Sequence, residues 1–138
     1  MNREIKFRVY DLLRGKIVSP ELCEYYFTNN QLCIGNSNWA EEAFGNYPIM
    51  QYTGLKDKNG KEIYEGDILT AEEYIWKDEG KFNYHGEVVF RDAAFFVKVH
   101  CVNPKKQGIS HGLFYDFMDA DFEIIGNIYE NPELLTNN

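Results

Sequence analysis

Short runs of alternating apolar and polar residues, separated by tight-turn motifs, constrain this chain more than any other feature. The opening run, residues 4–10, places Ile5, Phe7 and Val9 on one face and basic side chains on the other, which predicts a half-buried strand. Further strand candidates follow at 16–18, 49–53, 68–71, 85–91, 94–101 and 122–129. Short strands about 8–12 residues apart, joined by tight turns, are typical of a β-barrel or a β-sandwich.

Two turns in the middle of the chain are well marked. Asn59-Gly60 is the dipeptide best suited to a type I′ turn, in which both central residues need a positive φ. Glu65-Gly66-Asp67 predicts a second turn, where we expect the aspartate to bond to nearby backbone rather than to a ligand. Gly126 lies within the last predicted strand and indicates a kink there.

Other segments have weaker patterns. The run 22–27 fits either a strand or a helix, residues 39–44 fit a short helix that Gly45 would end, and 113–118 remains ambiguous. The segments 76–84 and 103–112 are polar and are expected to form loops. Asn131 followed by Pro132 predicts one helical turn over 131–135, with the asparagine as its cap.

Composition supports a mainly β fold. Aromatic residues make up 16% of the chain (10 Tyr, 10 Phe and 2 Trp), and Tyr and Phe favour strands. A length of 138 residues without a linker or repeat fits one domain. We therefore expect a mainly β, small barrel-like fold (SH3-like or pseudo-barrel), with one or two short helices in a single domain over residues 1–138.

Charge and hydropathy exclude several classes of protein. No stretch of about 18 apolar residues could span a membrane, and the first residues lack the apolar segment of a signal peptide. Three cysteines, an odd number, suggest a reducing cytoplasm. The net charge of −8 argues against a protein that coats nucleic acid by bulk charge.

The residues that could carry chemistry lack the spacing that chemistry needs. The acidic groups 116–123 and 62–67 do not fit a calcium loop, and the cysteines and histidines form no zinc motif. Gly54, Gly60 and Gly66 recur every six residues, but none opens a phosphate-binding helix. We expect no catalytic residue, no cofactor and no metal site.

Three segments resemble one family. The run 50–68 (MQYTGLKDKNGKEIYEGDI) is similar to the central motif of the YopX family, small proteins of phages and prophages in Gram-positive bacteria. Residues 3–11 resemble its opening strand, although many members have Ala-Trp-Asp where this chain has Val9-Tyr10-Asp11, and 123–135 resemble its closing segment. The resemblance implies a mostly β fold with a barrel-like core and a phage origin. It implies no settled activity and no catalytic residues.

Two functions remain open at this point. We expect a non-enzymatic protein-interaction module that acts in the bacterial cytoplasm, with a phage or host protein as its partner. Aromatic side chains in excess of a small core also predict a homo-oligomer. The alternative is a nucleic-acid-binding barrel that uses a basic hairpin at 56–61. Its candidate contact residues, for nucleic acid or a protein partner, are Lys56, Lys58, Lys61, Tyr52 and Tyr64.

Overall fold

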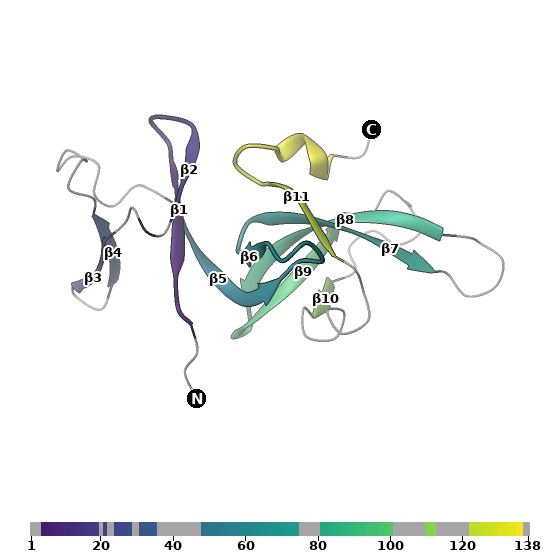
Figure 1. The fold of residues 1–138 in the computed structure, drawn as a ribbon, viewed down its shortest axis with the longest axis horizontal. Helices are drawn as coiled ribbons and strands as arrows, with labels where there is room; N and C mark the ends of the chain where they lie inside the picture. Colours follow the sequence, from purple (N-terminus) through teal and green to yellow (C-terminus); the bar gives the residue numbers. More distant parts are fainter. Residues whose placement is uncertain are drawn as a thin grey trace. The chain divides into compact units, whose positions relative to one another are not determined.

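The structure is a computed structural model that describes most of the chain in two compact units. It describes residues 4–19, 21, 24–28, 31–35, 48–74, 81–100, 110–112 and 122–136, some strands among them by their backbone alone. The first unit covers Met1–Gln51 and the second Tyr52–Asn138, and each is described by itself (Figure 1). Whether the chain is one domain therefore stays a prediction.

The first unit is built on a small antiparallel sheet. β1 (Phe7–Asp11) pairs with β2 (Lys16–Val18) on one side and with the first residues of β5 (Ile49–Lys56) on the other. Val9 lies opposite both Val18 and Ile49, and it is fully buried. A separate hairpin joins β3 (Glu24–Thr28) to β4 (Gln31–Gly35). The later residues of β5 pair with β6 (Glu62–Tyr64) in the second unit.

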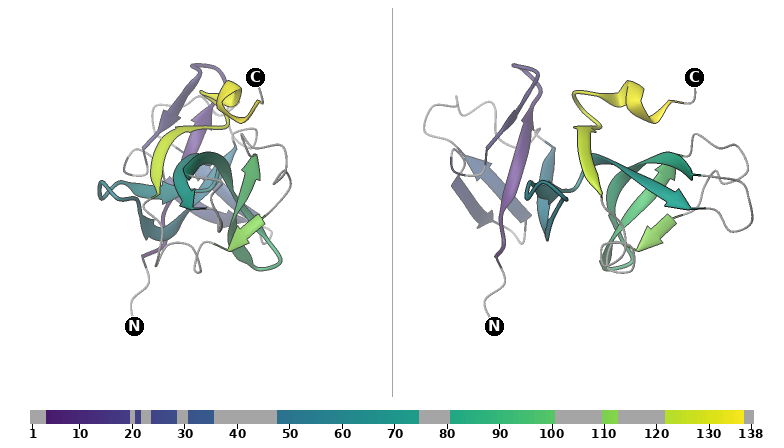
Figure 2. Two further views of the ribbon diagram at one scale, coloured as in Figure 1. Left: turned by 90° about the vertical axis from the view of Figure 1, so that its right-hand side faces the viewer. Right: turned by 45° about the vertical axis from the view of Figure 1, so that its right-hand side comes forward.

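The second unit contains a five-stranded antiparallel sheet in the order β10-β9-β8-β7-β11. Its strands are β7 (Asp67–Tyr74), β8 (Lys81–Arg91), β9 (Ala94–His100), β10 (Ser110–Gly112) and β11 (Glu123–Asn127). The sheet curls into a half-barrel, as the turned views show (Figure 2). The predicted mainly β, barrel-like fold is thus confirmed.

The inner face of this half-barrel holds the core. Ile63, Leu69, Val88, Val97 and Phe122 are at most 1% exposed and form one cluster, against which Leu55, Phe95 and Ile124 pack. Val88 and Val97 lie directly opposite each other on β8 and β9, so alternate residues of both strands line the core. Gly86 is also buried, and a Cβ added there would lie 2.1 Å from Cγ1 of Val97. Glycine fits at this position of β8 because a larger residue would collide with the side chain of Val97.

The type I′ turn predicted at Asn59-Gly60 is wrong. Only Asp92 (φ 49°) and Ala93 (φ 62°) have a positive φ among the described non-glycine residues, so Asn59 does not. The amide of Gly60 donates to the carbonyl of Asp57 at 2.9 Å, and Gly60 itself has φ 80°. This is a type I turn followed by a left-handed glycine, a common three-residue hairpin loop. The two positive φ values of a type I′ turn occur instead at Asp92-Ala93, between β8 and β9.

Several uncertain segments are now assigned. Residues 24–28 form a strand, β8 begins at Lys81 inside the expected loop 76–84, and 110–112 pair with β9 where a loop was expected. The possible helix at 39–44 and the run 113–118 lie outside the described residues. The helical turn predicted near the C-terminus is present as a 3-10 helix, Pro132–Leu135. The prediction that Asn131 caps it is wrong, because the Asn131 side chain makes no capping hydrogen bond to this helix.

The Asn131 side chain belongs to a hydrogen-bonded turn over residues 127–131, which follows β11. The Asn131 side chain accepts a hydrogen bond from the amide of Asn127 at 3.2 Å, and the Asn127 side chain accepts from the amides of Tyr129 and Glu130. The kink expected near Gly126 is present as a register shift between Ile124 and Gly126 in the pairing with β7. In the described part of the chain, no helix is long and apolar enough to cross a membrane.

Candidate functional site: two exposed hairpin loops

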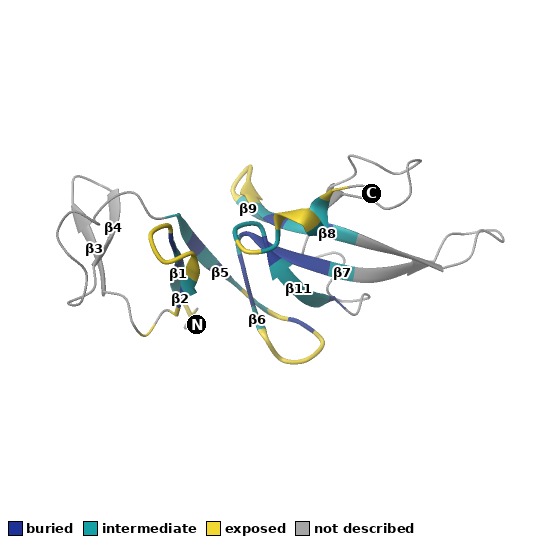
Figure 3. Cartoon of the chain, turned by 90° about the horizontal axis from the view of Figure 1, so that it is seen from above, coloured by how far each residue is buried: buried dark blue, intermediate teal, exposed yellow. Residues whose placement is uncertain are grey.

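The first candidate surface is the β5–β6 loop, residues 56–61, called here the lysine hairpin. Its three lysines, Lys56, Lys58 and Lys61, are all exposed. Figure 3 shows most of the loop between β5 and β6 as exposed. The backbone beneath them is closed by two bonds between Asp57 and its neighbours: its amide donates to the carbonyl of Lys61 at 2.8 Å, and its carbonyl accepts from Gly60. The lysines therefore extend from a defined turn.

A buried carboxylate fixes this turn and ties it to the sheet. Oδ1 of Asp57 accepts hydrogen bonds from the amides of Asn59 and Lys61, both at 2.9 Å. Oδ2 accepts from the amide of Ile124 in β11 at 3.1 Å, and the amide of Lys58 donates to the carbonyl of Phe122 at 2.9 Å. Asp57 is only 7% exposed. The lysine hairpin is thus joined to β11 as well as to its own strands.

The electrostatics of Asp57 follow from these bonds. Burial by itself raises the pKa of the carboxyl, but three backbone amides and the nearby positive charge of Lys61 favour the ionised form more strongly. The net result is a pKa of Asp57 below the ordinary value of 3.8. The carboxylate is therefore ionised at neutral pH and acts as a structural acceptor.

The surroundings of the lysines are less basic than the sequence suggested. Lys58 forms an ion pair with Glu123 at 3.2 Å, and Lys56 lies opposite Glu62 in the strand pairing. The two tyrosines proposed with the lysines, Tyr52 and Tyr64, are each only 6% exposed. Their rings pack on each other with centroids 5.4 Å apart. They contribute to the core, and their burial leaves little ring surface for a nucleic-acid base.

The second candidate surface was not predicted from the sequence. It is the loop between β1 and β2, residues 12–15, called here the leucine loop. Leu12 is 55% exposed and Leu13 is 84% exposed, the highest value among the large hydrophobic side chains that the structure describes. Residues 12–15 form the turn between β1 and β2, and the two adjacent leucines inside it were the signal that could have identified this surface.

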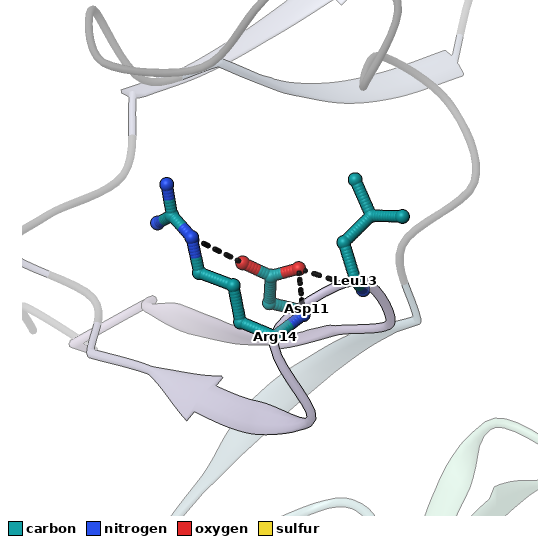
Figure 4. Close-up of polar contacts among 3 residues, drawn as sticks. All are labelled: Asp11, Leu13 and Arg14. Atoms are coloured by element: carbon teal, nitrogen blue, oxygen red, sulfur yellow. Dashed lines mark hydrogen bonds and ion pairs between the residues drawn. The ribbon is translucent and has the colours of Figure 1, made fainter.

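The backbone of the leucine loop is held by Asp11, whose side chain is almost fully buried. Its Oδ1 accepts hydrogen bonds from the amides of Leu13 at 2.9 Å and Arg14 at 3.1 Å, and its Oδ2 lies 3.7 Å from Nε of Arg14 (Figure 4). Gly15, with φ 68°, donates from its amide to the carbonyl of Asp11 at 2.7 Å. The loop therefore presents its leucines in one fixed backbone conformation.

The other acidic candidates have structural roles where they are described. Asp67 is 1% exposed and accepts a hydrogen bond from the amide of Tyr64 at 2.8 Å, a bond between neighbours across the turn. Within the described ranges, no three His, Cys, Asp or Glu side chains gather in a way that could hold a metal ion. Cys23, Cys101 and the acidic residues at 116–121 lie outside the described residues.

Comparison with known proteins gives the relationship of this chain. A comparison with curated proteins finds no match. Among solved structures, the chain is similar to protein EF1440 from Enterococcus faecalis, with 27% sequence identity and a TM-score of 0.58, over 98% of this chain and 100% of the other. Residues 6–136 match the family described as YopX protein. Because this match spans nearly all of both units, the chain belongs to the YopX family.

Proposed function

We propose that this YopX-family protein works by binding another protein, without catalysing a reaction, in the cytoplasm of a Gram-positive bacterium that carries a phage or prophage. The observation that carries the proposal is the leucine loop. Leu13 is 84% exposed on a turn whose backbone is fixed by a buried carboxylate. Apolar side chains gathered on a surface mark contacts with other proteins more often than isolated ones do.

The rigidity of the leucine loop adds to its suitability for binding. A flexible loop loses conformational entropy when a partner orders it, and this loss weakens association. The hydrogen bonds that the amides of Leu13 and Arg14 donate to Asp11 order the loop before a partner arrives. Burial of an exposed leucine in an interface then contributes its hydrophobic free energy with a smaller entropic cost.

The biological setting is supported by likeness. The sequence resembles proteins of phages and prophages, and the similar solved structure comes from a bacterium, Enterococcus faecalis. An odd number of cysteines is consistent with a reducing compartment. These observations support a phage-derived protein in the bacterial cytoplasm.

Affinity capture with matched variants tests the proposal. Tagged wild type, Leu13→Glu and Ile5→Glu would each be expressed beside an untagged wild-type copy in phage-infected cells. Their bound proteins, the untagged copy included, would be identified by mass spectrometry. Ile5 is 57% exposed and precedes β1 in the same unit, so its variant carries the same change of charge at a different place. We expect one protein to be retained by wild type and Ile5→Glu and lost with Leu13→Glu. Equal capture by all three would overturn the proposal.

A second candidate function rests on the lysine hairpin. Three exposed lysines on one rigid loop could contact phosphates. A gel shift with single- and double-stranded DNA and RNA at two salt concentrations discriminates between the candidates. The primary proposal predicts no shift. A shift that weakens steeply with salt, and that is lost when Lys58 and Lys61 are both changed to Gln, would favour nucleic-acid binding instead.

A further inference from the structure

We infer that the leucine loop of one copy of this protein docks on a second copy, whose residues outside 4–19 are acidic in sum. This inference deepens the proposed function, on which it rests, because it names the protein that the loop binds. The excess of aromatic residues predicts a homo-oligomer without indicating where the copies meet. The structure now points to a particular loop through which copies would associate.

The charge around the loop argues for this partner. Residues 4–19 contain four basic side chains (Lys6, Arg8, Arg14 and Lys16) and two acidic ones (Glu4 and Asp11), a net charge of +2. Since the whole chain carries −8, the remaining residues carry −10. The leucine loop is therefore an apolar tip on a basic segment, and the rest of an identical chain is acidic. Complementary charges of this kind favour encounter and fix orientation.

The local charges are arranged to act at the tip. Arg14 is in the loop itself, and its side chain is 57% exposed although it pairs with Asp11. Lys16 follows at the start of β2 and is exposed. Two leucines followed by two cations would contact a surface that offers apolar area with carboxylates beside it. Tip-to-tip packing is disfavoured because it would bring the cations of both copies together.

A contact of a loop on a different surface can still form a closed complex. If the loop of each copy docks on the other, a two-fold axis relates two identical contacts and the assembly stops at a dimer. Both leucine loops are then buried, so a substitution in the loop is present in both contacts and acts twice on one association constant. We therefore expect a dimer, and the loss of the leucine contacts should have a large effect on its dissociation constant.

Sedimentation equilibrium of the purified full chain, over a hundredfold range of concentration, tests this inference. Wild type should show a monomer–dimer equilibrium. Leu13→Glu should raise the dissociation constant by at least about tenfold, since an interfacial leucine is lost and a charge is introduced in both contacts. Ile5→Glu, the matched control, should leave the constant within about twofold of wild type. Thermal melts confirm that each variant is folded.

A second pair of variants separates local charge from net charge. Lys16→Gln removes a cation beside the loop, and Lys98→Gln removes an exposed lysine of β9 with the same change of net charge. We expect the dissociation constant to rise about two- to fivefold for Lys16→Gln and to stay unchanged for Lys98→Gln.

Two results would overturn the inference. One is a wild type that sediments as a single 16.2 kDa species throughout; the other is a dimer that Leu13→Glu leaves unchanged. The proposed function fails separately. A monomeric protein that still captures a different protein through Leu13 would retain the proposed function and exclude the second copy as its partner.

Discussion

Replacement of Asp57 by alanine is the perturbation with the best-defined structural consequence. The carboxylate accepts three backbone hydrogen bonds, from Asn59, Lys61 and Ile124, and it joins the lysine hairpin to β11. Alanine removes both acceptor oxygens, and with them all three bonds, and it leaves the amide of Ile124 partly buried without this partner. We expect the free energy of unfolding at neutral pH to fall.

The size of the effect follows from the kind of bond. A hydrogen bond to a charged group contributes about 1.5–3 kcal/mol, but such values do not add. The donors at Asn59 and Lys61 belong to exposed residues, so water can replace the carboxylate there, whereas the amide of Ile124 is less accessible. A loss of about 2–4 kcal/mol for Asp57→Ala is therefore expected, and about half of that for Asp57→Asn, which keeps one acceptor oxygen.

The pH dependence supplies an independent check. The pKa of Asp57 is below 3.8 in the folded chain and near 3.8 in the unfolded one. The ionised carboxylate therefore contributes its full stability above about pH 3.8, and this contribution is lost as the pH falls through the lower, folded pKa. The difference in stability between wild type and Asp57→Asn should shrink in strongly acidic solution.

Urea unfolding followed by circular dichroism, at neutral and at acidic pH, measures both effects. Asp92→Asn serves as the control, because Asp92 is an exposed turn residue whose positive φ asparagine tolerates. It should change stability by less than about 0.5 kcal/mol. A similarly small change for Asp57→Ala, or a difference from Asp57→Asn that persists undiminished at low pH, would refute the role assigned to this carboxylate.

Three further substitutions test the backbone. Gly86→Ala should lower stability by about 1–3 kcal/mol in urea unfolding, because its Cβ would lie 2.1 Å from Cγ1 of Val97; an unchanged midpoint would contradict this close packing. Ala93→Gly should raise stability by about 1 kcal/mol, because Ala93 has φ 62°, and a lower melting temperature would argue against that turn. Gly60→Val should cost about 1–2 kcal/mol in a thermal melt, since a β-branched residue is strained at φ 80°; no change would exclude the left-handed conformation.

The strands were predictable because their signal is local. Alternation along 7–9 and 95–98 reports directly which side chains face the core, and Val9 and Val97 are fully buried. Short strands were less predictable. The expected loop at 110–112 forms a strand because its backbone pairs with β9, and a pairing partner outside the segment leaves no trace in the segment's own sequence.

The turns show how neighbouring residues alter a local preference. Asn59-Gly60 favours a type I′ turn as a dipeptide, but Asp57 accepts bonds from the amides at 59 and 61 and so stabilises a type I turn with glycine after it. The type I′ turn at Asp92-Ala93 has no glycine. The pairing of Arg91 with Ala94 leaves only two residues for that turn, and the packing of the strands outweighs the strain of alanine.

The candidate site was only partly predictable, because the exposure of its side chains depends on strand pairing and on hydrogen bonds that the sequence does not show. Exposure of the lysines followed from their charge and their place in a turn. The burial of Tyr52 and Tyr64 could not be deduced, because an amphipathic aromatic side chain fits either surface, and the pairing of β5 with β6 places them together. The two adjacent leucines of the leucine loop are visible in the sequence, but the backbone conformation in which the turn presents them depends on the Asp11 bonds.

Site-specific photo-crosslinking in phage-infected cells tests the central claim, that the leucine loop contacts another protein. A photoreactive amino acid would replace Leu13 in one experiment and Ile5 in another. The account predicts a discrete crosslinked protein species of higher mass from position 13 and little from position 5; a species composed of two copies of this chain would also support the further inference. No crosslink from position 13, or equal crosslinking from both positions, would contradict it.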